Sequence, residues 1–134
     1  MRKIPDEKFE GMPCAQVAIS CAVGHIIPLT PSRADGYTTL ADANTYIREN
    51  LNISKSITFK RGERPTLSEF LTGNSIRSII CVSGHFIYFD GIAYWSFFNN
   101  DNDEVIRVWY IREYSLPRPS SAAQYWQRKN SKKR

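Results

Sequence analysis

Three side chains have the types and the sequence positions that acyl transfer through a thiol requires. Cys14 follows Pro13 at the start of an apolar run, and the first turn of a helix stabilises a thiolate through its dipole and its unpaired N–H groups. A nearby histidine would take the thiol proton, and a third polar group would hold the imidazole. His85 and Ser96 are the candidates for these two tasks. The set indicates nucleophilic catalysis through an activated thiol.

A predicted β-hairpin over residues 84–98 brings His85 and Ser96 together. Two short runs rich in aromatic and β-branched residues are joined there by Asp90-Gly91, and an Asp-Gly pair between such runs favours a tight type I′ turn. If the turn has two residues, counting outward places His85 directly opposite Ser96. Residues opposed in this way have Cβ atoms roughly 4.5–5.5 Å apart.

Helices are expected in the first half of the chain, where one of them carries the cysteine. The run Cys14–Val23 is apolar nearly all round, so it predicts a buried central helix, with Pro13 and Gly24 marking its ends. The other elements expected before the hairpin are a loop or lid over 25–38, a helix from Leu40 to about Asn50 capped by Thr39, a strand over 56–60, a short helix that follows a capping box over 66–69 and ends at Gly73, and a strand over 77–82.

Strands are expected to dominate the second half of the chain. After the hairpin, the sequence predicts an exposed turn over 99–104 and a further strand over 105–111. Helices first and consecutive strands afterwards predict an α+β fold. In this fold the N-terminal helices pack on a C-terminal antiparallel sheet that is arranged as a meander.

The composition limits the setting in which the chain would work. Its 134 residues are enough for one domain with a buried core, and no apolar run reaches the roughly 18 residues of a membrane span. Three cysteines without paired spacing, and an N-terminus without a secretory signal, indicate free thiols in a reducing, cytoplasmic setting and no membrane partner. Cys14, Cys21 and His25 lack the close paired spacing of a zinc site, so neither a metal nor another cofactor is expected.

The positive charge is concentrated in a C-terminal tail. Residues 117–134 hold six basic and no acidic residues, whereas residues 1–116 hold twelve basic and thirteen acidic ones. The sequence therefore divides into a near-neutral domain over 1–116 and a basic, flexible tail over 117–134. Such a tail is usually a solvated end, and the alternative is an arm that binds nucleic acid or an acidic partner. Tyr125 and Trp126 would either stack on bases or hold the tail against the core.

The chain resembles the small papain-like cysteine peptidase domains of short phage and bacterial proteins. The residues that carry the resemblance are 13–24, with the cysteine at the helix start, and 83–96, with Gly-His, a short strand, Asp-Gly and a second strand containing a tyrosine. The resemblance extends over residues 10–112. It implies a papain-like fold, Cys14 as the nucleophile, His85 as the base, and a peptide or protein as the substrate.

Two positions depart from the papain-like pattern. The pattern usually has Asp or Asn just after the tyrosine, where this chain has Trp95 and then Ser96. It also usually has a glutamine shortly before the cysteine, and none precedes Cys14. These departures leave a second hypothesis open, in which the papain-like fold is a catalytically inactive protein-binding module. Such a module would bind a host protein through its aromatic sheet and its basic tail.

Overall fold

The computed structural model describes residues 1–28 and 39–112 of the chain. The loop expected over 25–38 lies mostly outside these residues, and the tail over 117–134 lies wholly outside them. The strands are β1 (Arg2–Lys3), β2 (Ile53–Thr58), β3 (Ser78–Val82), β4 (His85–Phe89), β5 (Tyr94–Trp95) and β6 (Val105–Ile111), and the helices are the 3₁₀ turn η1 (Glu7–Phe9), α1 (Cys14–Val23), α2 (Leu40–Asn50) and α3 (Leu67–Leu71).

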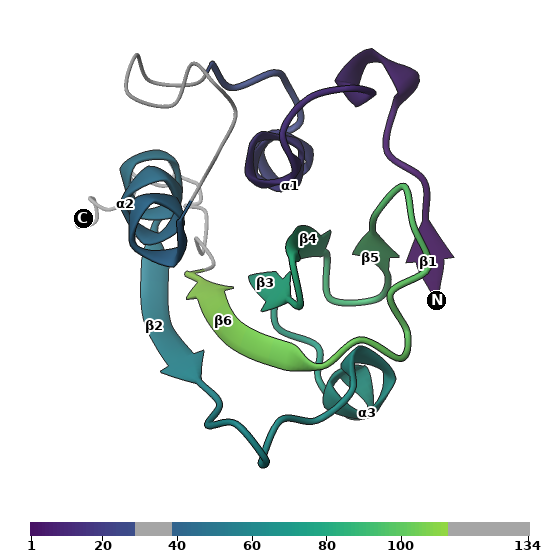
Figure 1. Cartoon of the computed structure of the whole chain (residues 1–134). Coiled ribbons are helices and arrows are strands. Elements are labelled where there is room, and N and C mark those ends of the chain that lie inside the picture. The colour runs from purple at the N-terminus through teal and green to yellow at the C-terminus, as the bar shows by residue number, and fades with distance from the viewer. Residues whose placement is uncertain (29–38, 113–134) are drawn as a thin grey trace, which may run out of the picture.

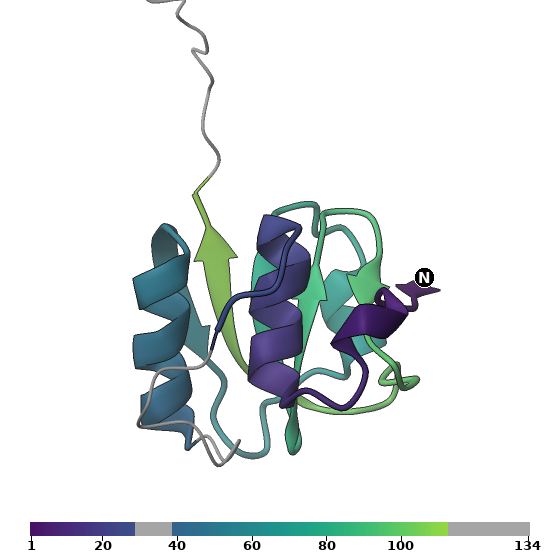
Figure 2. The same cartoon turned by 90° about the horizontal axis from the view of Figure 1, so that it is seen from above.

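One mixed sheet joins the six strands found in the described residues, in the order β1-β5-β4-β3-β6-β2. β1 pairs with β5 in parallel, and the other neighbouring pairs are antiparallel. α1 and α2 lie side by side on one face of the sheet and α3 lies on the other (Figure 1, Figure 2). The α+β class expected from the order of elements is therefore confirmed.

Strand alternation divides the core into two layers. On β3, Ile79 and Cys81 belong to the layer under α1 and α2, whereas Ile80 and Val82 belong to the layer that contains α3. This division follows because successive side chains of a strand point to opposite faces of a sheet. Trp109 of β6 is fully buried in the first layer, where its indole N–H donates to Asn44 Oδ1 of α2 at 2.9 Å, and the helix that begins with the cysteine packs on β4.

Local capping signals predicted the helices well. Gly24 ends α1 with a left-handed φ of 88°, a conformation that glycine adopts without a Cβ clash. The hydroxyl of Thr39 caps α2 by accepting the backbone N–H of Asp42 at 3.1 Å. The capping box over 66–69 forms as predicted, although α3 ends before Gly73.

The sheet is not the antiparallel meander that the strand order predicted. β6 lies beside β3 rather than beside β5, β1 joins in parallel, and β2 joins from between α2 and α3. Residues 108–111 of β6 are buried on both faces. An interior position between two strands suits such a segment, because it pairs the backbone on both sides and covers both rows of side chains.

The hairpin between β4 and β5 has a longer loop than the two-residue turn considered from the sequence. Phe89 pairs with Tyr94, so residues 90–93 form the loop. His85 is consequently not directly opposite Ser96, and that cross-strand pairing was wrong. The register differs by two positions, and a shift of two keeps each side chain on the same face of a sheet. His85 and Ser96 therefore remain on a common face.

Asp90 explains why the loop is longer. Its Oδ1 accepts the backbone N–H groups of Ile92 and Ala93 at 2.8 Å each, an arrangement in which an Asp side chain substitutes for backbone in closing a turn. Gly91 is required here, because its φ is 101° and a Cβ would lie 2.9 Å from the carbonyl oxygen of Ser75.

Candidate active site

Cys14 is the first residue of α1 and lies where that helix packs against β4. The first backbone N–H groups of a helix have no partners within the helix, so the thiol stands at the positive end of the helix dipole. The cysteine is half-buried and unpaired by any disulfide. No hydrogen bond to Cys14 is present within the described residues, so its thiol remains available.

His85 opens β4 directly after the tight turn Ser83-Gly84, in which Gly84 has a φ of 71°. The Nε2 atom of His85 lies 3.2 Å from Ser96 Oγ. The imidazole also packs edge-on against Phe98, with ring centroids 5.6 Å apart and an interplanar angle of 79°. These two contacts hold the ring from two sides.

Burial lowers the pKa of His85 from its ordinary value of 6.5, and the nearby carboxylate of Asp103 partly offsets this effect. Desolvation acts in this direction because it disfavours the charged imidazolium. His85 is therefore neutral at pH 7, which is the state in which an imidazole can accept a proton.

Ser96 connects His85 to two further polar residues. Its hydroxyl donates to Asn100 Oδ1 at 2.6 Å, and Asn100 Nδ2 donates to Asp103 Oδ2 at 2.7 Å. The backbone N–H of Phe98 also donates to Ser96 Oγ, at 3.1 Å. Ser96 is 2% exposed and Asn100 is 6% exposed, so this chain of hydrogen bonds is shielded from solvent.

The N-terminal strand holds the backbone of Ser96. Its N–H donates to the carbonyl oxygen of Lys3 at 3.1 Å, and the N–H of Tyr94 donates to that of Met1 at the same distance. Arg2 donates to the carbonyl oxygen of Ser96 at 3.2 Å. β5 has only two residues, and Ser96 directly follows it, so the bonds from β1 and its neighbours hold the backbone on both sides of this short strand.

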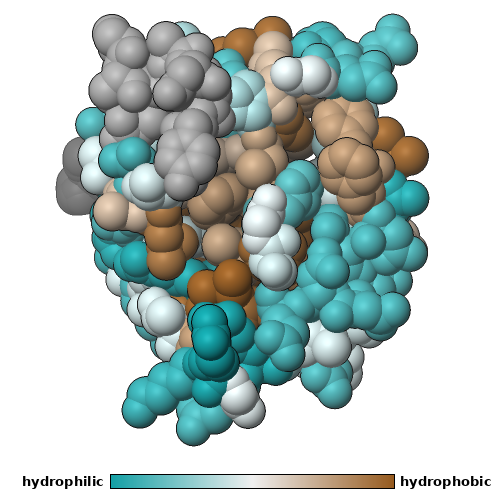
Figure 3. All heavy atoms as spheres, viewed as in Figure 1, coloured by the Kyte–Doolittle hydropathy of each residue, from teal (hydrophilic) through white to brown (hydrophobic). Residues whose placement is uncertain are grey.

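One pocket of about 310 Å³ is lined by all three predicted site residues, Cys14, His85 and Ser96. Its other walls come from residues 10–12, from α1 and from the aromatic segment 95–98. Figure 3 shows the face of the molecule on which α1 begins, with apolar residues reaching the surface through its middle. The structure brings the three residues to one cavity, but within the described residues a hydrogen bond joins only His85 to Ser96 and none joins Cys14 to His85.

The other two cysteines are in environments that suppress reactivity. Burial raises the pKa of Cys21 to about 11, and burial together with the proximity of Cys14 raises the pKa of Cys81 to about 11. A thiol is a nucleophile only when it is ionised. His25 is exposed and lies beside the carbonyl oxygen of Ile26, outside the pocket.

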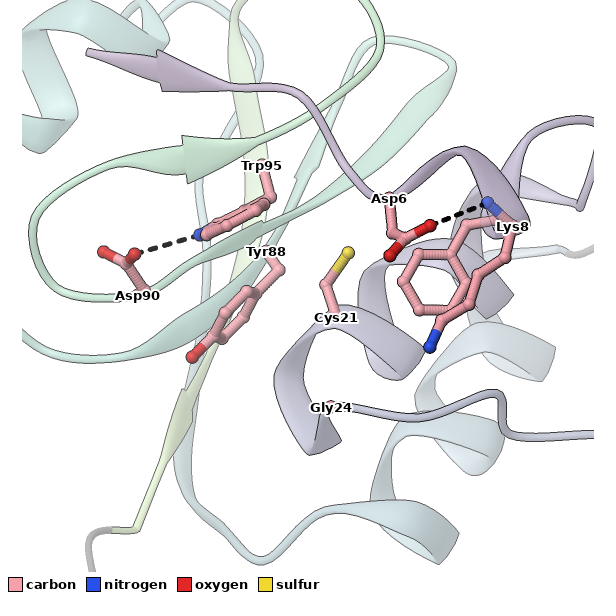
Figure 4. Close-up of a pocket in the computed structure, with 8 residues that line it drawn as sticks. Asp6, Lys8, Cys21, Gly24, Tyr88, Asp90 and Trp95 are labelled. Atoms are coloured by element: carbon pink, nitrogen blue, oxygen red, sulfur yellow. Dashed lines mark hydrogen bonds between the residues drawn. The ribbon is translucent and has the colours of Figure 1, made fainter.

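A second hollow of about 340 Å³ adjoins the first and shares Trp95 with it. Figure 4 shows Cys21 of α1 projecting between Trp95 and Tyr88 on one side and Asp6 on the other. The indole N–H of Trp95 donates to Asp90 Oδ2 at 2.9 Å, which fixes the indole as the wall between the two hollows. The two cavities together follow the side of α1 that carries Cys14 and Cys21.

The sequence did not indicate Asn100 or Asp103 as part of the site. Residues 99–104 were expected to form an exposed turn, and this prediction was wrong at Asn100, which is buried. The side chain turns inward because it bridges Ser96 and Asp103. A run rich in Asn and Asp predicts turn chemistry equally well whether its side chains face water or the core, so the sequence held no signal that separates the two.

The described residues contain no group of three or more metal-ligating side chains that could hold an ion. They also contain no helix with the length and apolar character needed to cross a bilayer. Comparisons of the chain with protein-family models, with curated proteins and with solved structures found no match.

Proposed function

We propose that this protein is a papain-like thiol hydrolase that cleaves peptide or isopeptide bonds, with Cys14 as its nucleophile and His85 as its base. The observation that carries the proposal is the single pocket lined by a helix-start cysteine, a neutral histidine and the serine that holds this histidine. Cys14 begins α1, His85 begins β4 and Ser96 directly follows β5, so residues far apart in the sequence line the same cavity. The small papain-like proteins of phages and bacteria, which the chain resembles, share the helix-start cysteine and the histidine, although Ser96 stands where they usually have Asp or Asn.

The proposed reaction proceeds in two steps. His85 takes the proton of the Cys14 thiol, the thiolate attacks the carbonyl carbon, and the protonated imidazole then gives its proton to the departing amine. This leaves an acyl-thioester. His85 then takes a proton from a water molecule, whose oxygen attacks the carbonyl carbon; the C–S bond breaks, the acid leaves, and the imidazolium returns the proton to the Cys14 thiolate. The unpaired N–H groups at the start of α1 can bind the oxyanion, in place of the glutamine that the chain lacks.

The absence of a hydrogen bond between Cys14 and His85 is compatible with this role. Catalytic hydrogen bonds are often long or poorly aligned before substrate binds, and the imidazole here is already in the cavity. The adjoining hollow around Trp95, Tyr88 and Cys21 is the place where a neighbouring side chain of the substrate would lie. Its lining combines aromatic residues with the charged residues Asp6, Lys8 and Asp90, which suits a side chain that has both an apolar body and a polar end. A free thiol of this kind belongs in a reducing compartment such as the cytoplasm.

Site-resolved alkylation with iodoacetamide over a range of pH tests the nucleophile. At neutral pH, Cys14 is expected to be alkylated faster than a cysteine in an unstructured peptide, and His85→Ala should slow the reaction to the rate of that peptide. His25→Ala removes the other histidine, which is exposed and outside the pocket, and should change nothing. Ordinary thiol behaviour of Cys14 in all three proteins would exclude an activated nucleophile.

A second candidate function is protein binding without catalysis. The observation that favours it is the lack of a hydrogen bond between Cys14 and His85 within the described residues. Phe98 beside the pocket is 64% exposed, so an aromatic contact for a partner protein is available there. In a capture experiment from host lysate, this function predicts a partner that Phe98→Ser loses and Cys14→Ala retains. The chain truncated after residue 116 would show whether the basic tail takes part. If none of these proteins captured a specific partner, protein binding would no longer be a candidate function.

A further inference from the structure

We propose that Asp103 fixes the tautomer of His85 through Asn100 and Ser96, so that the imidazole carries its proton on Nε2 and keeps the lone pair of Nδ1 free. The three residues would then be positioning residues for the base of the pocket. Only this last step rests on the proposed function, because the tautomer itself follows from hydrogen bonds alone.

Asp103 determines which group donates and which accepts in each hydrogen bond of the series Asp103–Asn100–Ser96–His85. A carboxylate has acceptors and no donor, so the group of Asn100 that lies 2.7 Å from Asp103 Oδ2 must be the amide NH₂. The opposite orientation would place the amide oxygen against a carboxylate oxygen. The amide oxygen of Asn100 therefore faces Ser96, which is the arrangement that the structure has.

The donor and acceptor roles of Ser96 in turn decide the role of His85. A serine hydroxyl has one hydrogen and two lone pairs. The hydrogen goes to Asn100 Oδ1 at 2.6 Å, and one lone pair accepts the backbone N–H of Phe98 at 3.1 Å. The second lone pair is left for His85 Nε2 at 3.2 Å, which can bond to it only as an N–H donor. A neutral imidazole has one proton, so Nδ1 has none.

The surrounding backbone keeps this chain of bonds in place. The N–H of Asn100 donates to the hydroxyl of Tyr94 at 3.0 Å, and that hydroxyl donates to Asp101 Oδ1 at 2.6 Å. The N–H of Asp103 donates back to the carbonyl oxygen of Asn100 at 3.0 Å. No bond to Nδ1 of His85 is present within the described residues. The papain-like pattern has an acid next to the tyrosine. In this chain the proposed acid is Asp103, which acts on His85 through two intervening residues, Asn100 and Ser96.

Nitrogen NMR of the imidazole tests the tautomer directly. In ¹⁵N-labelled protein at a pH where His85 is neutral, Nε2 should show the chemical shift of a protonated ring nitrogen and Nδ1 that of an unprotonated one. The ring signals are assigned with His25→Gln, which leaves His85 as the only histidine of the chain. A protonated Nδ1 in the wild-type protein would overturn the proposal without any variant.

Asp103→Asn tests the source of the direction. An Asn side chain can donate as well as accept, so the chain of bonds can reverse, and we expect the single tautomer of His85 to be lost to a mixture. Asp101→Asn is the matched control, because Asp101 belongs to the same turn but bonds Tyr94 rather than Asn100, and it should leave the tautomer unchanged. An unchanged tautomer in Asp103→Asn would overturn the proposal.

The same spectra separate this inference from the proposed function. Cys14→Ala is expected to keep the Nε2-protonated tautomer, since the thiol takes no part in the chain of bonds. A fixed tautomer together with an ordinary Cys14 thiol would support the positioning of His85 and refute the hydrolase. An activated Cys14 thiol together with a proton on Nδ1 of His85 would support the hydrolase and refute the proposed positioning of His85.

Discussion

At the scale of single residues, the three cysteines show how environment decides chemistry. Cys21 and Cys81 have pKa values of about 11, so at pH 7 roughly one in ten thousand of these thiols is ionised. Cys14 instead stands at a helix start and faces a pocket with a neutral histidine. Alkylation at neutral pH should therefore report on Cys14 with little background from the other two.

The depressed pKa of His85 predicts a pH dependence of stability. Burial lowers this pKa below 6.5 in the folded protein, so the unfolded chain binds more protons at mildly acidic pH. The stability that neutral His85 contributes is fully present above pH 6.5, and it is lost as the pH falls from there through the folded pKa. Urea denaturation at a series of pH values should show this loss in the wild-type protein and a flatter profile in His85→Gln.

The matched control for this prediction is His25→Gln, since His25 is exposed. It should keep the wild-type slope of unfolding free energy against pH. If His85→Gln kept that slope as well, another group would be responsible for it.

The residues of the site differ in how far the sequence could predict them. Cys14 and His85 were singled out because a cysteine at a helix start and a histidine at a strand start match the pairing that thiol nucleophiles use. Ser96 was found through a cross-strand pairing that proved wrong, and it still bonds His85 because the register error was an even number of residues. Asn100 and Asp103 were missed because their hydrogen bonds to Ser96 and to each other depend on which way a turn faces.

At the scale of elements, the sequence predicts helix bounds, which depend on neighbouring residues, but not strand order, which depends on contacts between distant residues. α1 and α2 have the predicted bounds, since the residues that start and stop a helix are its sequence neighbours. The position of β6 between β3 and β2 could not be read from the sequence. Many strand orders satisfy the same alternation of side chains, and only the packing of the whole sheet selects one.

The β4–β5 loop gives a test of backbone constraint at the level of an element. Gly91→Ala should destabilise the protein by about 1–3 kcal/mol, because it adds a Cβ at a φ of 101° and 2.9 Å from the carbonyl oxygen of Ser75. Gly62→Ala is the matched control. Its φ of 88° carries a similar conformational penalty, but nothing lies within 4 Å of the added Cβ.

The measurement is the free energy of unfolding of the two variants in urea. Gly91→Ala should be the less stable of the two, and the difference between them is the cost of the close approach to Ser75. Equal destabilisation would mean that the loop moves away from Ser75 at no cost.

At the scale of the whole molecule, the charge divides between two parts of the chain. Without residues 117–134 the formal net charge changes from +5 to −1. We expect the truncated chain to lose any salt-sensitive binding to single-stranded nucleic acid, because such binding depends on cationic side chains that displace counterions. Its thermal unfolding midpoint should stay close to that of the full chain.

Fluorescence anisotropy of a labelled oligonucleotide at several salt concentrations measures this binding. Retained, salt-sensitive binding by residues 1–116 would locate a nucleic-acid surface in the near-neutral part and refute the assignment to the tail. Absence of binding by the full chain would remove nucleic acid as a partner of the tail.

The parallel pairing of β1 with β5 has a practical consequence for anyone who handles this protein. The carbonyl oxygens of Met1 and Lys3 accept the backbone N–H groups of Tyr94 and Ser96, so an affinity tag joined ahead of Met1 would strain the backbone next to the serine that bonds His85. Purified protein with such a tag would pass as well folded in a global measurement and still hold His85 less firmly. A tag placed after Arg134, or one cleaved off before any assay, avoids that artefact.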